Sequence, residues 1–382
     1  MTKTAMLLTG PLGLGHRVMA DCCAQPLERS GWHTRRLDSI SLLGPLSGGA
    51  GMRVFNRLMA VPGLYDGLHF AHLRTGSRLA DLMARSSTAR LVPALRAELD
   101  RQPADLIVSV FATGACAAAA LKADMPELRT VVLCTDVAVH RMWVAEGTDL
   151  FLVTSAAAAA SVRRYLPRAP VAVVPPPVRP EFFAAPSQQQ ARQSIGIAPD
   201  DFCVLLIDSG WGFGPLVESV AALARAGVHV LAVAGRDRGI ERRLRELAAR
   251  TPRITPFGYT DRVPELMAAA DVVMALPGAN TCNEARVVGR HLLLLDLMPG
   301  HGRDNLLHEL ELGAADVCVP TAAGVTASVA ALRGAGIGPA ASSVPRWDPA
   351  YLAALRRIGL DLEPREDPTP HAAHAIPQPT IF

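Results

Sequence analysis

The sequence has little lysine, few aromatic residues and no long apolar run. Its only lysines are Lys3 and Lys122, so nearly all of its 38 basic side chains are arginines. Aromatic residues make up 5% of the chain and hydrophobic residues 50%, so we expect cores built from Ala, Val and Leu. No apolar run reaches the roughly 18 residues that a membrane span needs. The formal net charge of +3 is too small to argue for a nucleic-acid partner.

The cysteines exclude a disulfide framework. There are seven of them, they are scattered, and none forms a CxxC pair. Buried, reduced thiols in a cytoplasmic protein are the economical interpretation. The N-terminus leads directly into a strand-like run, which predicts no signal peptide.

Apolar strand-like runs alternate with helical periods in both halves of the chain. The expected strands of the first half are 5–9, 34–38, 105–110, 130–134, 150–154 and 171–174. Those of the second half are 203–207, 229–234, 254–257, 271–276, 292–295 and 317–320. Each half opens with a strand, a glycine-rich turn and a helix. This rhythm predicts an α/β fold with two doubly wound domains, for which 382 residues suffice.

A Pro-rich and then polar stretch near residues 176–188 predicts the domain boundary. We expect an N-terminal domain over 1–178 and a C-terminal domain over 188–345. A last helix over 346–362 and a disordered tail over 363–382 would follow.

Residues 44–101 interrupt the rhythm of the first domain with arginines interleaved among apolar residues. The pattern predicts a helical excursion. Its apolar face either packs on the sheet or lies on an anionic membrane surface, and both interpretations stay open. The second one would place a cytoplasmic protein at the inner face of the membrane.

The segment 276–285, LPGANTCNEA, follows an expected strand and enters a helix that should start near Thr281. Unpaired N–H groups at a helix N-terminus suit a diphosphate. Glu284, one turn into the helix, would then reach sugar hydroxyls. The spacing of Thr281 and Glu284 is also that of a capping box, which the spacing alone favours.

In the first half, the turn 10–16 allows close backbone approach to a ligand, and His16 stands at its exit. A histidine there can take a proton from an attacking hydroxyl, or it merely caps the helix. Asp136 follows the strand 130–134 and would orient His16 if the two loops are neighbours, but it also suits a helix N-cap. Asp38 keeps open a nicotinamide enzyme, because its distance from the turn suits a ribose hydroxyl.

In the second half, Gly212 and Gly214 form a turn that can lie over phosphates. Arg236 ends a strand and brings a guanidinium to the same edge of the sheet. Asp304 and Asn305 follow another strand and carry groups that pair well with sugar hydroxyls. Loops of this composition are also common simply as turns.

The order of these motifs resembles the monogalactosyldiacylglycerol synthases, the bacterial processive diacylglycerol glucosyltransferases and, more distantly, the MurG-type N-acetylglucosaminyltransferases. The motifs are GLGH (13–16), TDVAVHRMW (135–143), PPPVRPEF (175–182), SGWGFGP (209–215), AGRDRGIERRL (234–244), FGYTDRVPELMAAADVVMALPGANTCNEA (257–285) and MPGHGRDN (298–305). The resemblance runs from about residue 5 to 320, and its most specific part is 257–285.

The resemblance implies the GT-B fold, in which two Rossmann-like domains face each other across a cleft and the last helix returns to the first domain. It implies a UDP-sugar donor, single displacement with inversion, and neither cofactor nor metal. The implied donor-binding residues are Phe257, Gly258 and Tyr259 at the uracil, Glu284 at the ribose, Gly278, Ala279, Asn280 and Thr281 with Gly212 and Gly214 at the diphosphate, Arg236 beside them, and Asp304 and Asn305 at the sugar. The acceptor would meet Gly13, Gly15, His140 and Trp143, with His16 as base and Asp136 near it.

Two departures from the family pattern bear on the donor. Leu276 stands where relatives often carry a lysine, so a charge near the donor is missing. His301, Gly302 and Arg303 stand where relatives carry acidic and glutamine residues. Arg303 would meet a carboxylate, as in a glucuronic-type donor.

The expected function is transfer of a sugar from a UDP-sugar to a hydroxyl of a lipid-like, prenyl-linked or other natural-product acceptor. The expected partners are the nucleotide sugar, that acceptor and an anionic membrane surface, with no nucleic acid. The alternatives are a UDP-sugar 2-epimerase of the same fold and a nucleotide-sugar-binding protein without activity.

Overall fold

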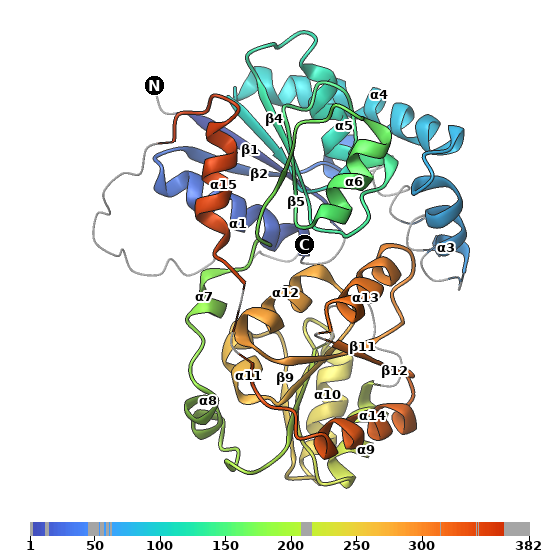
Figure 1. Ribbon diagram of the computed structural model, residues 1–382, viewed down its shortest axis with the longest axis vertical. Helices are drawn as coiled ribbons and strands as arrows, with labels where there is room; N and C mark the ends of the chain where they lie inside the picture. The colour runs from blue at the N-terminus through green and yellow to red at the C-terminus, as the bar shows by residue number, and fades with distance from the viewer. Residues whose placement is uncertain are drawn as a thin grey trace.

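The computed structural model describes residues 3–11, 15–44, 53, 57–58, 61, 63–207, 216–313, 315–340, 342 and 344–362. They form two α/β halves, one above the other in Figure 1. Gly13, Gly212, Gly214, much of the segment 45–62 and the predicted tail 363–382 lie outside the described residues.

The first half is built on a parallel sheet of six strands in the order β2-β1-β3-β4-β5-β6. The strands are β1 (Thr4–Thr9), β2 (His33–Asp38), β3 (Leu106–Ser109), β4 (Arg129–Cys134), β5 (Leu150–Val153) and β6 (Val171–Val173). Helices α1 (Gly15–Arg29), α5 (Ala112–Leu121) and α6 (Ala156–Tyr165) connect them. Every residue of β3 and β5 is buried, as expected of parallel strands that helices cover on both faces.

The second half repeats this plan with the order β12-β11-β10-β7-β8-β9. Its strands are β7 (Cys203–Ile207), β8 (His229–Val233), β9 (Ile254–Phe257), β10 (Val272–Ala275), β11 (His291–Leu295) and β12 (Ala315–Cys318). Its helices are α9 (Leu216–Arg225), α10 (Arg238–Ala248), α11 (Val263–Ala269), α12 (Ala279–Val288), α13 (His301–Glu311) and α14 (Ala322–Gly334). The predicted strands are confirmed to within a few residues; the largest shift is in β12, which starts two residues earlier than expected.

Both sheets reverse their strand order at one place, between β1 and β3 in the first and between β7 and β10 in the second. Ligands of open α/β sheets bind beyond the carboxyl ends of the strands at such a reversal. His16 follows β1, and α12 follows β10. The segment with the candidate base His16 and the segment expected to bind the diphosphate therefore lie at the two reversal points.

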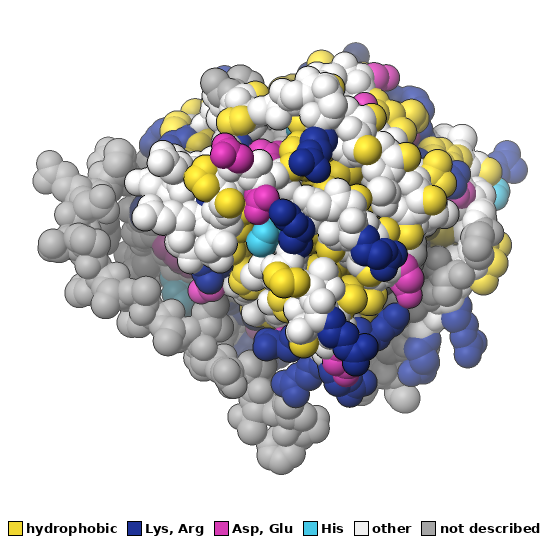
Figure 2. Space-filling model, turned by 90° about the horizontal axis from the view of Figure 1, so that it is seen from below, with side chains coloured by type: hydrophobic (Ala, Val, Ile, Leu, Met, Phe, Trp, Pro, Cys, Tyr) yellow, Lys and Arg dark blue, Asp and Glu magenta, His cyan; other side chains and the backbone are white. Residues whose placement is uncertain are grey.

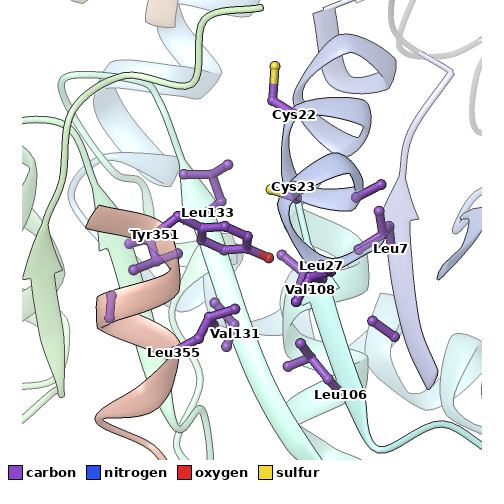
Figure 3. Close-up of a cluster of buried hydrophobic side chains, with 14 of the residues drawn as sticks. Leu7, Cys22, Cys23, Leu27, Leu106, Val108, Val131, Leu133, Tyr351 and Leu355 are labelled. Carbon is purple, nitrogen blue, oxygen red and sulfur yellow. The ribbon is translucent and has the colours of Figure 1, made fainter. Parts of the chain in front are cut away.

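The chain crosses between the halves twice. The first crossing leads through α7 (Pro180–Phe183) to α8 (Gln188–Ile195), and the second returns to α15 (Trp347–Arg356) beside α1 (Figure 1). Figure 3 shows Tyr351 and Leu355 of α15 turned toward the cluster that contains Leu133 and Val108 of the first sheet. Trp347 also donates a hydrogen bond from Nε1 to the backbone oxygen of Cys22 at 3.0 Å. Burying these aromatic rings attaches the end of the described chain to the first half.

The excursion after β2 is helical where it is described. It contains α3 (Leu64–Leu68), the π-helical turn η2 (His69–Leu73) and α4 (Arg78–Arg101). Ser77 caps α4 by accepting a hydrogen bond from the N–H of Ala80. The second half of α4 packs Leu91, Leu95 and Leu99 on the sheet, whereas Leu79 and Leu82 at its start are 42% and 64% exposed.

Candidate active site

The helix α12 starts two residues earlier than its sequence predicts. Its first residue is Ala279 and its N-cap is Gly278, with no side-chain hydrogen bond at the cap. Thr281 therefore lies inside the first turn, and the capping-box interpretation of Thr281 and Glu284 is wrong. A glycine cap leaves the first N–H groups of the helix without side-chain partners, which is the arrangement that a phosphate uses.

Glu284 is buried in α12 and is paired with Arg179 from the first crossing. Nη2 and Nε of Arg179 donate to Oε1 of Glu284 at 3.0 and 3.3 Å. Burial raises the pKa of Glu284 to about 7, and the positive charge of Arg179 opposes part of that rise. The carboxylate thus has a cation on one side and is near the threshold between its two protonation states at neutral pH.

Among the described residues, His16 has a hydrogen-bond partner at only one of its two ring nitrogens. Its Nδ1 lies 2.7 Å from the backbone oxygen of Val110. A carbonyl oxygen only accepts, so Nδ1 carries the hydrogen and Nε2 is left as the acceptor. Burial lowers the pKa of His16, while the hydrogen bond to Val110 and the charge of Asp136 oppose the shift. A neutral imidazole with a free nitrogen is what a general base requires.

One hydrogen bond joins the two reversal points. Nδ2 of Asn280, in the first turn of α12, donates to the backbone oxygen of Gly15 at 3.1 Å. A side chain added at Gly15 would place its Cβ 3.3 Å from that same Nδ2. The start of α12 and the start of α1, which carries His16, therefore lie against each other.

Asp136 and Asn305 also meet across the two halves. Nδ2 of Asn305 lies 3.4 Å from Oδ1 of Asp136 and 3.3 Å from the backbone oxygen of Pro277. Its Oδ1 accepts from the N–H of Val137 at 3.2 Å. Asn305 is only 4% exposed. It connects the segment after β4 with the segment after β10.

Asp304 is used in a second contact, which we call the cross-domain cluster: Asp66, His69 and Arg74 of the excursion with Gly300, Arg303 and Asp304 of the second half. Nε2 of His69 lies 3.2 Å from one oxygen of Asp304, and Arg74 pairs with the other. Asp66 accepts from the N–H of Gly300 at 2.6 Å and pairs with Arg303 at 3.1 Å. Arg303, which the sequence offered to a donor carboxylate, faces Asp66 and Asp296 instead.

The residues expected at the uracil lie at and just after the end of β9, and Arg236, expected beside the diphosphate, lies shortly after the end of β8. The guanidinium of Arg236 lies over the ring of Tyr259, 4.9 Å from its centroid, and Tyr259 is 63% exposed. Phe257 is partly buried against the core of the second half. A Cβ at Gly258 would approach the carboxylate of Glu241 to 2.6 Å, so a side chain here would displace Glu241.

Of the two aromatic residues expected at the acceptor, one is largely withdrawn from solvent. Trp143 is 5% exposed and belongs to a hydrophobic cluster of the first half. His140 lies with its ring 6.0 Å from that of His69, and burial together with this neighbour lowers the pKa of His140 to about 3. His140 is therefore a neutral neighbour of the cross-domain cluster.

Two other expectations of the sequence concern a nicotinamide site and metal ligands. Asp38, the candidate for a nicotinamide ribose, accepts from the N–H groups of Ile40 and Ser41 at 2.8 and 3.3 Å and so closes a turn. Among the described residues, no group of three or more His, Cys, Asp or Glu side chains is placed to hold a metal ion.

Two six-stranded parallel sheets, each with its reversal point turned toward the other half, define the GT-B class of fold. The crystal structure of MurG from Acinetobacter baumannii has this fold: it matches with a TM-score of 0.55 at 14% identity, over 93% of this chain and 95% of that one.

The family resemblance is also confirmed. Residues 26–178 match the model of the monogalactosyldiacylglycerol (MGDG) synthase family, and residues 213–318 match the glycosyltransferase family 28 C-terminal domain.

Curated relatives match part of the chain. The processive diacylglycerol beta-glucosyltransferase of Bacillus pumilus is 26% identical over 192 residues, which are 49% of this chain and 50% of the relative. The probable monogalactosyldiacylglycerol synthase 2 of Oryza sativa subsp. indica is 25% identical over 248 residues, 62% of this chain and 49% of the relative. The chain thus spans about half the length of the curated relatives it matches.

Sequence reasoning missed the residues that act between the halves. Arg179 stands inside the motif 175–182, but nothing in its local pattern names Glu284, 105 positions away, as its partner. His69 and Arg74 were part of an arginine-rich excursion whose partners lie more than 200 positions further on. The sequence signal for this contact was His69, a polar residue inside an otherwise apolar helical stretch.

Proposed function

We propose that the protein is an inverting glycosyltransferase that moves a sugar from a UDP-sugar to a hydroxyl of a lipid-like acceptor. The observation that carries this proposal is the junction of Asn280 with Gly15. It brings the N-terminus of α12, suited to a diphosphate, against the start of α1, where Nε2 of His16 has no partner among the described residues. The activities for which the matched relatives are named, diacylglycerol glucosylation and monogalactosyldiacylglycerol synthesis, support the same reaction class.

The reaction would proceed in one displacement. The acceptor oxygen attacks the anomeric carbon of the donor while Nε2 of His16 takes the hydroxyl proton. The bond between that carbon and the phosphate oxygen breaks, and UDP leaves with the electron pair. The charge of Asp136 stabilises the imidazolium, since Asp136 raises the pKa of His16. The first N–H groups of α12 would stabilise the leaving diphosphate without a metal.

The donor would lie along the second half. Glu284 would accept hydrogen bonds from the ribose hydroxyls one turn beyond the diphosphate. The exposed ring of Tyr259, backed by Arg236, offers a flat surface for the uracil.

The lipid-like acceptor would be reached at a membrane surface through the excursion. Four large apolar side chains of this segment stand in solvent: Val61 (50%), Leu64 (50%), Leu79 (42%) and Leu82 (64%). Exposed arginines, Arg78 and Arg85, flank the last two on α4. Apolar side chains between basic ones are typical of helices that lie on anionic bilayers.

Charge alone does not single out this face. Figure 2 shows that dark-blue basic side chains also gather at the opposite end of the molecule. The proposal therefore depends on the exposed leucines. Along the described part of the chain, no helix is long and apolar enough to cross a bilayer.

Calorimetric titration with UDP in the presence of EDTA tests the donor site. We expect the parent to bind, and Glu284→Ala to lose about 1–3 kcal/mol of binding free energy, the cost of an unmet hydrogen-bonding partner. A parent that does not bind UDP would contradict the proposal.

Turnover then separates the alternatives. With UDP-glucose or UDP-galactose and diacylglycerol in vesicles, the proposal predicts release of UDP that requires the acceptor. Conversion of the UDP-sugar without an acceptor would indicate an epimerase, and binding without turnover of any UDP-sugar would indicate a binding protein.

Sedimentation with phosphatidylglycerol vesicles tests the membrane surface. Leu79→Glu with Leu82→Glu should abolish binding to the vesicles. Leu312→Glu is the matched control, because Leu312 is a leucine of the second half that is 50% exposed. Equal binding by both variants would contradict a membrane role for α4.

A further inference from the structure

Arg179 lies at the hinge between the halves and is held there by its neighbours. Val178 before it and Phe182 after it are buried in the core of the second half. Its guanidinium lies over the ring of Phe182, 4.8 Å from the centroid. The side chain is 32% exposed and is therefore not fixed by burial alone. Its stacking on Phe182 and its two hydrogen bonds to Glu284 orient it.

The two oxygens of Glu284 are not equivalent. Oε1 takes both hydrogen bonds from Arg179, whereas Oε2 accepts none from the described residues. The Glu284 side chain is nevertheless only 9% exposed. Oε2 is not among the fully buried polar atoms that lack a partner, so it keeps contact with solvent and is the part of the carboxylate that a ligand can reach.

Among the described residues, four ionisable groups interact electrostatically with the carboxylate of Glu284. Arg179 and Glu181 act on the carboxylate directly. The thiols of Cys22 on α1 and Cys282 on α12 both have raised pKa values, that of Cys22 to about 12, so they are neutral near pH 7. Arg179 is the only cation in this set.

We propose that Arg179 is a positioning residue for the nucleotide: it holds Oε1 of Glu284, keeps the carboxylate ionised, and leaves Oε2 to accept the ribose hydroxyls. This inference rests on the proposed function.

The physical reason is the cost of burying a charge. Burial raises the pKa of Glu284 to about 7 even with Arg179 in place, so loss of the guanidinium must raise it further. A protonated carboxyl offers a weaker acceptor than a carboxylate, because charge-assisted hydrogen bonds are roughly twice as strong. Binding of the nucleotide must therefore weaken as the pH falls through the pKa of Glu284.

Titration calorimetry with UDP-glucose between pH 6 and 8.5 tests this. UDP-glucose is the probe because the terminal phosphate of UDP itself titrates near about pH 6, whereas the sugar ester does not. The pKa of His16 is lowered from its ordinary 6.5, so His16 takes up a proton only below the pH at which Glu284 titrates. For the parent we expect affinity to fall about tenfold from pH 8 to pH 6, as for a single group with a pKa near 7 that must be ionised.

Arg179→Met should move the midpoint of this profile to higher pH and weaken binding at pH 7 on the order of tenfold. Arg179→Lys keeps a positive charge at the hinge and should restore part of the shift. Glu284→Gln should bind weakly with a flat profile, because nothing at this position titrates.

Arg346→Met is the matched control. Arg346 lies in the second crossing with its guanidinium 5.1 Å from the ring centroid of Phe183, and it has no contact with Glu284. It should leave both the affinity and its pH profile unchanged. If Arg179→Met weakens binding equally at every pH, Arg179 only packs the hinge and the inference is overturned.

Two outcomes separate this inference from the proposed function. A parent that binds UDP-glucose with a flat profile contradicts only the role of Arg179. A parent that does not bind UDP-glucose at pH 8 contradicts the proposed function, and the role of Arg179 falls with it.

Discussion

Two contacts between the second half and the rest of the chain, one with the first crossing and one with the excursion, each bury a carboxylate, and they do so differently. On the left of Figure 1, beside α7, Arg179 pairs with Glu284; on the right, α3 and the segment after it meet α13 through the cross-domain cluster. Glu284 has one partner and one open oxygen. Asp304 has His69 on one oxygen and Arg74 on the other.

The difference shows which of the two is available to a ligand. The sequence offered both Glu284 and Asp304 to the donor. In the structure Oε2 of Glu284 has no partner among the described residues, whereas each oxygen of Asp304 already has a side chain of the excursion as its partner. We expect the Arg179–Glu284 pair to govern nucleotide binding and the cross-domain cluster to govern stability and the position of the excursion.

The largest effect should come from a residue that belongs to neither contact. His16→Ala should reduce turnover by a factor of about 10²–10⁴, the usual contribution of a general base, with UDP affinity unchanged. Steady-state rates with the lipid acceptor and calorimetry with UDP measure the two effects. His33→Ala, at an exposed position of β2, is the control. Unchanged turnover of His16→Ala would remove His16 from the mechanism.

Asp304→Ala should separate the two contacts most clearly. It leaves His69, which is 0% exposed, without its partner, so the free energy of unfolding should fall by about 1–3 kcal/mol. UDP affinity should change little. Urea denaturation and calorimetry measure these effects, with Glu284→Ala as the comparison. Normal stability with lost donor binding would reverse our assignment and place Asp304 at the donor sugar.

The contribution of Glu284 to the free energy of unfolding should decrease as the pH rises, which is the opposite of an ordinary ion-paired carboxylate. The pKa of this carboxyl is raised in the folded protein, from an ordinary 4.5 to about 7. Its contribution to stability is therefore fully present below about pH 4.5 and is lost as the pH rises through 7. Glu284→Gln should be more stable than the parent by about 1–2 kcal/mol above pH 7, and the gain should vanish toward pH 5. A gain that does not depend on pH would mean that the carboxyl does not titrate in this range.

The sequence predicts the parts of this protein that depend on local pattern. Parallel strands buried on both faces give apolar runs, and the glycine-capped helix starts follow them, so the two sheets and the placement of His16 could be anticipated. Partners far apart in the chain could not: Arg179 and Glu284 are 105 positions apart, and His69 and Asp304 are 235 apart. Which carboxylate is open and which is occupied depends on these pairs.

The capping box failed for a reason that a local pattern does not contain. A Thr followed three residues later by a Glu has the spacing of a capping box wherever the helix begins. Here Gly278 takes the N-cap position, and Thr281 falls inside the helix. At α8 the same kind of spacing is a true capping box: Ser187 and Gln190 cap each other's backbone N–H groups.

This pair of helix starts gives the smallest predicted effect and a direct check. Thr281→Ala should change the free energy of unfolding by no more than about 0.5 kcal/mol, as at a position that caps nothing. Ser187→Ala should lose about 1 kcal/mol, the usual cost of removing an N-cap. Urea denaturation of both variants under the same conditions measures the difference. Equal losses would mean that Thr281 caps α12 after all. The first N–H groups of that helix would then already have a side-chain partner, and the proposed diphosphate site next to Glu284 would be weakened.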